Sequence, residues 1–142
     1  MRDSLAQYIG IPFRANGRDP ATGWDCWGCA RYVMRYVYDI PVPDELDDLE
    51  YNIKRLPRCA DLIAHYQAQS RWDAVPMDLA QEGDVVLLRM NGHPVHMGLT
   101  VERGKMIHVW SGIDTCIESY VKTDWISRIV GIYRYGWSDN RA

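Results

Sequence analysis

The chain has 142 residues, of which 47% are hydrophobic and 25% are charged, and its formal net charge is −3. This length and balance predict one globular domain over residues 1–142 and exclude a disordered chain. A weakly negative chain without a basic run is not expected to bind nucleic acid, and no apolar stretch is long enough for membrane insertion. The N-terminus lacks the apolar core of a signal peptide, so we expect synthesis and folding in the cytoplasm.

The N-terminal half carries helical patterns separated by loops. Residues 4–9 predict a short helix, and residues 10–23 predict a loop because glycine and proline recur in it. A helix is expected over residues 26–38, ending before two prolines that cannot continue it. A second helix is expected over residues 57–69, with a proline early in it and an apolar stripe on one face. Residues 72–81 predict a connection.

The C-terminal half changes to the patterns of strands. Residues 84–89 are apolar enough for a buried strand, and residues 95–101 and 105–110 alternate between apolar and other side chains. Further strands are expected over residues 117–121 and 129–135. Helices first and an antiparallel meander afterwards predict an α+β fold, with helices packed on a central antiparallel sheet of about five strands.

Cys26 occupies the first position of the predicted helix over residues 26–38. Asp25 before it is a favourable N-cap, because its carboxylate can accept a hydrogen bond from an unpaired amide of the first turn. The positive end of the helix dipole favours the thiolate form of Cys26, and the thiolate is the nucleophile. Cys29 falls on the apolar face of the same helix, beside Ala30. Taken alone, this stretch fits a capped core helix with two cysteines equally well.

Two histidines lie on neighbouring strands of one predicted hairpin. Residues 102–104 form a three-residue loop that ends in glycine, which suits the left-handed conformation common at that place. Val101 would then pair with Lys105, and His96 and His108 would share one face of the sheet, about 7–8 Å apart at Cα. A two-residue loop would place them on opposite faces. One histidine can act as a base while the other orients it, as in a catalytic triad.

These motifs resemble the NlpC-type cell-wall peptidases, bacterial relatives of the papain-like cysteine peptidases. The matching pieces cover most of the chain, in the same order and in the same strand and helix context. They are Gly10–Arg14, Gly23–Gly28, Gly83–Val86, His96–Leu99 and Met106–His108.

The resemblance implies a papain-like domain in which Cys26 is the nucleophile, His96 the general base and His108 the orienting third member. It implies cleavage of a peptidoglycan stem peptide between D-glutamate, through its γ-carboxyl, and a diamino acid, without a metal or a cofactor. Residues 17–28 are similar to the phage branch of the family. That likeness implies other tail proteins as partners and incorporation in a phage tail or phage-like particle after synthesis in a bacterial cytoplasm.

Two residues depart from the family pattern. Phe13 stands where the family usually has tyrosine, whose hydroxyl can help to bind the oxyanion; phenylalanine has no donor, so the Cys26 amide and another group would have to serve. Cys29 stands where the family usually has an aliphatic residue. Both changes leave Cys26, His96 and His108 in place.

Three other interpretations compete with a peptidase. Residues 26–29 form a C-x-x-C motif, which is typical of thiol redox proteins, although no parallel βαβ pattern surrounds it. Cys26, Cys29, His96 and His108 have the right chemistry for a zinc site, but the histidines lie on separate strands. A catalytically silent tail-structural or wall-binding module on the same fold is the third. The acidic run 44–48 is expected to be solvated.

Overall fold

The computed structural model describes residues 4–43, 55–69 and 71–136. Its elements, in chain order, are η1 (Leu5–Tyr8), β1 (Arg18–Asp19), β2 (Gly23–Trp24), α1 (Cys26–Tyr36), α2 (Leu56–Gln69), β3 (Trp72–Val75), η3 (Met77–Leu79), β4 (Val85–Met90), β5 (His93–Glu102), β6 (Lys105–Trp110), β7 (Ile113–Ser119), η4 (Asp124–Arg128) and β8 (Ile129–Tyr135). The η elements are short 3-10 helices. The acidic run 44–48 lies outside the described residues.

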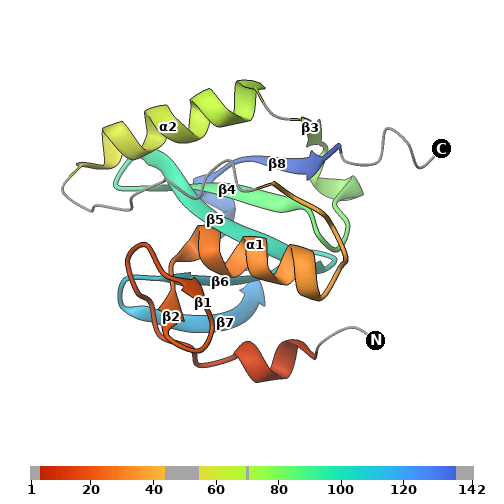
Figure 1. The fold of residues 1–142 in the computed structure, drawn as a ribbon. Coiled ribbons are helices and arrows are strands. Elements are labelled where there is room, and N and C mark those ends of the chain that lie inside the picture. Colours follow the sequence, from red (N-terminus) through yellow and green to blue (C-terminus); the bar gives the residue numbers. More distant parts are fainter. Residues whose placement is uncertain (1–3, 44–54, 70, 137–142) are drawn as a thin grey trace.

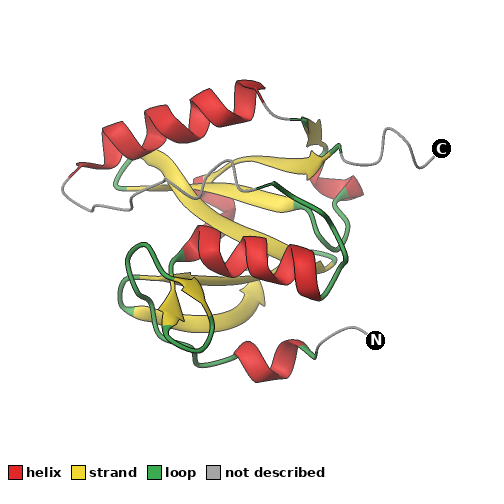
Figure 2. Ribbon diagram, viewed as in Figure 1, coloured by secondary structure: helices red, strands yellow, loops and turns green. Residues whose placement is uncertain are grey.

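Six strands form an antiparallel sheet in the order β3-β8-β4-β5-β6-β7 (Figure 1). Both α1 and α2 pack on β5, and Figure 2 shows the red helices against the yellow sheet. Apolar side chains at alternate positions of β5 meet the helices in the larger core. A smaller core covers the opposite face, around Met106 and Tyr120. This confirms the predicted α+β, papain-like fold.

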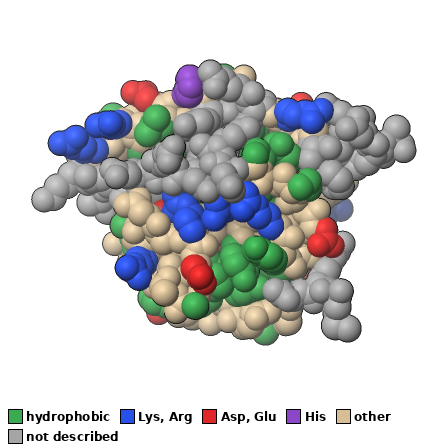
Figure 3. Space-filling model, in the orientation of Figure 1, with side chains coloured by type: hydrophobic (Ala, Val, Ile, Leu, Met, Phe, Trp, Pro, Cys, Tyr) green, Lys and Arg blue, Asp and Glu red, His purple; other side chains and the backbone are tan. Residues whose placement is uncertain are grey.

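The predicted helices are present, with small differences at their ends. The first segment is a 3-10 helix, and α1 ends at Tyr36, two residues before the predicted Tyr38. Asp39 adopts a left-handed φ of 55°, which ends the helical path ahead of Pro41. Basic side chains gather over α1 on the face drawn in Figure 3, and Arg35 donates from two nitrogens to the Val42 carbonyl. These hydrogen bonds hold the chain that follows α1 against it.

The predicted connection over residues 72–81 contains a strand that the sequence pattern missed. Residues Trp72–Val75 form β3, which pairs with β8 at the edge of the sheet. The segment is short and half-exposed, so it lacks the alternation that marks a strand with one buried face. No helix among the described residues is long and apolar enough to cross a membrane.

The hairpin that carries the two histidines has a shorter loop than predicted, yet it keeps the predicted register. Glu102, and not Val101, pairs with Lys105, so the loop has only two residues. The register shifts between Thr100 and Glu102, and beyond this bulge Leu99 pairs with Ile107 as expected. An extra residue on one strand compensates for a loop that is one residue shorter. His96 and His108 therefore still lie on one face.

Candidate active site

The start of α1 is fixed by a buried carboxylate. Asp25 is the N-cap, and its side chain accepts a hydrogen bond of 2.8 Å from the Gly28 amide. Its second oxygen accepts from Arg18 and from the Asn16 amide. Burial raises the pKa of the Asp25 carboxyl, and the Arg18 charge opposes that effect. The cap thus ties the preceding loop to the helix and fixes the position of Cys26.

The same loop is also tied to the sheet. The buried indole of Trp24 donates from Nε1 to Thr115 Oγ1 at 2.8 Å, and that hydroxyl donates to the Ile11 carbonyl. The Gly10 amide donates to the Thr115 carbonyl. Thr115 lies in β7, so the loop before α1 cannot shift without breaking bonds to the strand next to the histidines.

Cys26 lies at the first position of α1 and is buried, with 1% of its surface exposed. Its Sγ atom lies 3.9 Å from the Val95 carbonyl oxygen in β5. Val95 directly precedes His96. The structure therefore places the predicted nucleophile beside the strand segment that carries the predicted base.

His96 and His108 are hydrogen-bonded to each other, and a carboxylate continues the chain. His96 Nε2 lies 2.9 Å from His108 Nδ1, and His108 Nε2 lies 2.9 Å from Glu118 Oε2. Trp125 donates from Nε1 to the other oxygen of Glu118, also at 2.9 Å. We call His96, His108 and Glu118 the histidine relay. Sequence reasoning identified its two histidines but missed Glu118 and Trp125.

The carboxylate at the end of the histidine relay dictates where the ring protons lie. An ionised carboxylate only accepts, so His108 must carry its proton on Nε2 and accept at Nδ1. His96 then donates from Nε2, which leaves the lone pair of a neutral imidazole on Nδ1. His96 Nδ1 is buried and has no hydrogen-bond partner among the described residues. This lone pair is the position at which the His96 ring can accept a proton.

The pKa values in the relay fit this proton pattern. Burial lowers the pKa of His96 well below its usual value, and repulsion from His108, whenever that ring is protonated, and from Arg128 acts in the same direction. Burial also lowers the pKa of His108, although Glu118 opposes this. Burial raises the pKa of the Glu118 carboxyl, but hydrogen bonds from His108 and its neighbours outweigh it and leave the pKa below its usual value. Near neutral pH the His96 and His108 rings are therefore neutral, and the Glu118 carboxylate is ionised.

Aromatic side chains enclose the histidines. The His96 ring lies 4.9 Å from Trp110 and 5.4 Å from Trp125, measured between ring centroids. Trp125 also meets His108 edge-on, and Phe13 lies 6.1 Å from Trp110. This apolar shell keeps the two imidazole rings from solvent and strengthens the hydrogen bond between them. Phe13, which stands at a usual tyrosine position, is thus in the aromatic surroundings of His96.

Cys29 lies in the larger core and is not a member of the histidine relay. It is fully buried in the larger core, and burial raises the pKa of its thiol well above the usual value. All four cysteines are free thiols. The four residues of the alternative zinc interpretation do not form a ligand group among the described residues, where the cluster that does form is His108, Cys116 and Glu118. The C-x-x-C spacing places Cys29 one helical turn after Cys26, and Cys29 is a member of the larger core.

Finding Glu118 from the sequence would have needed the correct bounds and register of β7. Cys116 pairs directly with His108 across β6 and β7, and Glu118 lies two residues further on the same face. The predicted strand began at residue 117, whereas β7 begins at Ile113. The four omitted residues contain the one that pairs with His108, so the prediction could not connect β7 with the histidines.

A cysteine at a helix N-terminus beside a sheet with paired histidines defines the class as a papain-like α+β domain. The NlpC/P60 family model matches residues 10–134, and the chain belongs to this family.

Three similar proteins illustrate the relationship. The murein DD-endopeptidase MepH of Escherichia coli (strain K12) is 30% identical over 137 residues, covering 93% of this chain and 44% of MepH. The chain therefore spans less than half the length of that relative. The NlpC/p60 domain of the peptidoglycan hydrolase SagA has a TM-score of 0.57 at 21% identity, covering 91% of both chains. An NlpC/P60 family protein of Bacillus cereus has a TM-score of 0.62 at 21% identity, covering 90% of this chain and 36% of that protein.

Proposed function

We propose that this protein is a cysteine endopeptidase that cleaves the stem peptides of peptidoglycan at the bond between D-glutamate, through its γ-carboxyl, and a diamino acid. The observation that carries the proposal is the continuous hydrogen-bonded relay from His96 to Glu118, next to the helix that presents Cys26. Membership of the NlpC/P60 family supports the substrate class. Relatives named as a peptidoglycan hydrolase and a murein endopeptidase support it further.

The relay supports a two-step hydrolysis. His96 takes the thiol proton at Nδ1, and Cys26 Sγ attacks the amide carbonyl of the substrate. His96 then protonates the leaving amine, and a thioester to Cys26 remains. In the second step His96 deprotonates water, which attacks the thioester and releases Cys26 as a thiol. His108 and Glu118 hold the His96 ring in the tautomer that each proton transfer needs.

The oxyanion of each tetrahedral intermediate needs donors as well. The backbone amide of Cys26 is at the N-terminus of α1, where amides lack helical partners and the dipole favours negative charge. Phe13 contributes no hydroxyl, so we assign oxyanion binding to the Cys26 amide together with a group brought by the substrate or by the loop before α1.

Digestion of purified peptidoglycan by the wild type and by Cys26→Ala tests this proposal. Mass analysis should show new N-terminal diamino acids with the wild type only. The name of MepH favours a second candidate, hydrolysis of a D,D-bond, which would instead separate cross-linked stem peptides into monomers. Wall binding without either product would favour a catalytically silent module, for which Phe13 is the motivating residue.

We also propose that the protein is made in a bacterial cytoplasm and then incorporated in a phage tail or phage-like particle, with other tail proteins as its neighbours. The support is the likeness of residues 17–28 to the phage branch of the family. In this stretch Arg18 and Asp25 form the ion pair that fixes the nucleophile helix. Mass spectrometry of purified particles tests the proposal, and particles that lack the protein would contradict it.

A further inference from the structure

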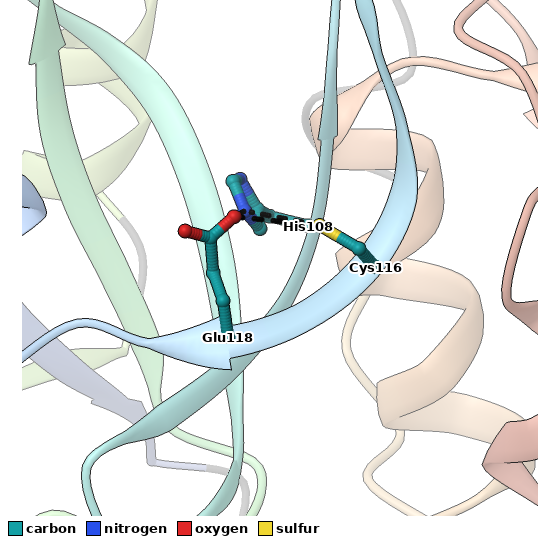
Figure 4. A group of neighbouring side chains, drawn as sticks. All are labelled: His108, Cys116 and Glu118. Atoms are coloured by element: carbon teal, nitrogen blue, oxygen red, sulfur yellow. Dashed lines mark hydrogen bonds and ion pairs between the residues drawn. The ribbon is translucent and has the colours of Figure 1, made fainter. Parts of the chain in front are cut away.

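Three potential metal ligands converge on the side of His108 that faces away from His96 (Figure 4). His108 Nε2 lies 3.6 Å from Cys116 Sγ and 2.9 Å from Glu118 Oε2, and the thiol lies 3.4 Å from the same carboxylate oxygen. Within the part of the chain that the structure describes, this is the one group of its kind. We call it the His108–Cys116–Glu118 cluster.

The spacing of these atoms suits a tetrahedral transition metal. Bond lengths to zinc of about 2.0–2.1 Å for nitrogen, 2.3 Å for sulfur and 2.0–2.2 Å for oxygen place the ligand atoms of a tetrahedron about 3.3–3.6 Å apart. Both distances from Cys116 fall close to this range. The distance between His108 and Glu118 must widen by about half an ångström, which a side-chain rotation of Glu118 can supply.

The backbone holds the cluster in place. His108 and Cys116 are direct cross-strand partners, and Glu118 follows on the same face of β7. Trp125 binds one carboxylate oxygen of Glu118 and leaves the other directed at the cluster. Outer-shell contacts of this kind orient ligands in metal sites. The cluster is thus preorganised by the sheet and not by a mobile loop.

A cation can reach the cluster from solvent. The Glu118 side chain is 34% exposed and lines a surface pocket together with Asp124 and Arg128. Cys116 is partly exposed, whereas His108 is fully buried. The carboxylate therefore faces the pocket, and the imidazole lies in the interior behind it. Three protein ligands leave one position for water, as in zinc sites that remain open.

We propose that the His108–Cys116–Glu118 cluster binds a divalent transition cation such as Zn²⁺, and that the bound cation inhibits the peptidase. A mixed imidazole, thiolate and carboxylate set suits zinc better than magnesium or calcium, which prefer oxygen alone. The binding part stands on the cluster alone. The inhibition part rests on the proposed function.

Inhibition follows from proton positions in the histidine relay. Metal coordination takes the lone pair of His108 Nε2, so its ring proton must lie on Nδ1 and point at His96 Nε2. Neutral His96 then accepts at Nε2 and carries its own proton on Nδ1, which removes the lone pair that takes the thiol proton. On binding, the Cys116 thiol and His108 Nε2 each release a proton to water. The proton on His96 Nε2 moves to His108 Nδ1, and His96 Nδ1 takes up one proton from water, so one proton is released in total. With the cation bound, His108 donates the hydrogen bond to His96, whereas without it His96 donates to His108.

Cobalt absorption tests the binding part. Metal-free protein titrated with CoCl₂ should develop a thiolate-to-cobalt charge-transfer band that saturates at one equivalent, and ZnCl₂ should remove it. Cys26→Ala should keep the band, whereas Cys116→Ser should lose it. Cys59→Ala, which alters a core cysteine far from the relay in the sequence, is the matched control and should keep it. A band that survives in Cys116→Ser or disappears in Cys26→Ala would overturn the proposed site.

Zinc titration of peptidoglycan hydrolysis tests the inhibition part. ZnCl₂ should inhibit the wild type reversibly, with EDTA restoring the rate. Cys116→Ser should need about ten-fold more zinc or greater for half-inhibition, measured relative to its own rate without zinc, the effect expected from loss of a metal ligand. Equal inhibition of both proteins would overturn this part. A protein that hydrolyses no wall but shows the cobalt band would contradict the proposed function and leave the metal site standing.

Discussion

His96 Nε2 lies 2.9 Å from His108 Nδ1, and the two ring centroids are 5.1 Å apart on neighbouring strands. This hydrogen bond links His96, which we propose as the base, through His108 to the Glu118 carboxylate. Because each ring uses one nitrogen to donate and the other to accept, the state of Glu118 determines the state of His96. The site is better described as a nucleophile with a three-membered relay than as a simple triad.

His96 should be harder to replace than His108. His96→Ala removes the group to which we assign the proton transfers, so turnover of a stem peptide should fall by about 10³-fold or more. In His108→Gln the amide oxygen can accept from His96 and the amide nitrogen can donate to Glu118. That variant should lose about ten-fold, and His108→Ala should lie between the two. The measurement is kcat for each folded variant, and a His108→Gln variant as inactive as His96→Ala would contradict the assigned roles.

Glu118 should act as a positioning residue. In Glu118→Gln one amide oxygen cannot accept from both His108 and Trp125, and the amide NH₂ must face one of these donors. We expect kcat to fall by about ten-fold with little change in KM, measured in EDTA. Nitrogen NMR of the imidazoles should show loss of the proton on His108 Nε2. The exposed Glu102→Gln variant is the control, and an unchanged tautomer in Glu118→Gln would contradict the relay.

Cys26 should react with iodoacetamide before the other thiols at neutral pH. Burial raises the pKa of Cys29 well above its usual value, that of Cys59 to about 12 and that of Cys116 to about 11, so these thiols stay protonated. Cys26 has the helix N-terminus, and we assign His96 as its base. Peptide mapping by mass spectrometry after brief labelling gives the order. Cys116 is more exposed than Cys26. Earlier modification of Cys116 would therefore show that solvent exposure of the thiol, and not its thiolate form, determines the order of labelling.

The protein should lose stability as the pH falls through the weakly acidic range. The pKa of His96 and that of His108 are lower in the folded chain than their usual value, so the unfolded chain binds more protons below about pH 6.5. The free energy of unfolding should decrease by up to about 1.4 kcal/mol per pH unit for each ring. Urea unfolding at about pH 7.5 and 5 measures this. His96→Gln should flatten the dependence.

Cys29 should be dispensable for hydrolysis. It is fully buried among apolar side chains, so Cys29→Val keeps the character of the position and should cost about 1.5 kcal/mol of stability or less. Hydrolysis of purified peptidoglycan should remain within about two-fold of the wild type. A folded Cys29→Val variant that loses hydrolysis, or that loses a thiol–disulfide exchange activity present in the wild type, would support the redox interpretation.

The parts of the site that depend on local sequence were predictable. Asp25 and Cys26 are neighbours at a helix start, and capping needs only a few residues, so the cap at Asp25 and the position of Cys26 at the start of α1 followed from the sequence. The shared face of the two histidines was also predicted. The predicted three-residue loop is instead a two-residue loop together with a bulge in β5. Both arrangements of the hairpin pair Leu99 with Ile107, so the predicted face of the histidines was correct.

The parts that depend on distant pairing were not predictable in this way. The edge strand β3 is held by β8, which follows it by more than 50 residues, and its own residues show no alternation. Glu118 joins the relay only through the register of β6 and β7 and through an indole from η4. Such neighbours come from tertiary packing, which periodicity in one segment does not encode.

The separation of the site residues along the chain bears on the order in which activity can arise. His108 is 12 residues from His96 and 10 from Glu118, whereas Cys26 and its contact Val95 are 69 apart. Closing short loops costs less entropy, so the meander can assemble the relay before α1 docks. A partly folded chain would then contain the complete relay while Cys26 is still remote from it. The proposed peptidase activity would appear only when the long-range contact between α1 and β5 forms.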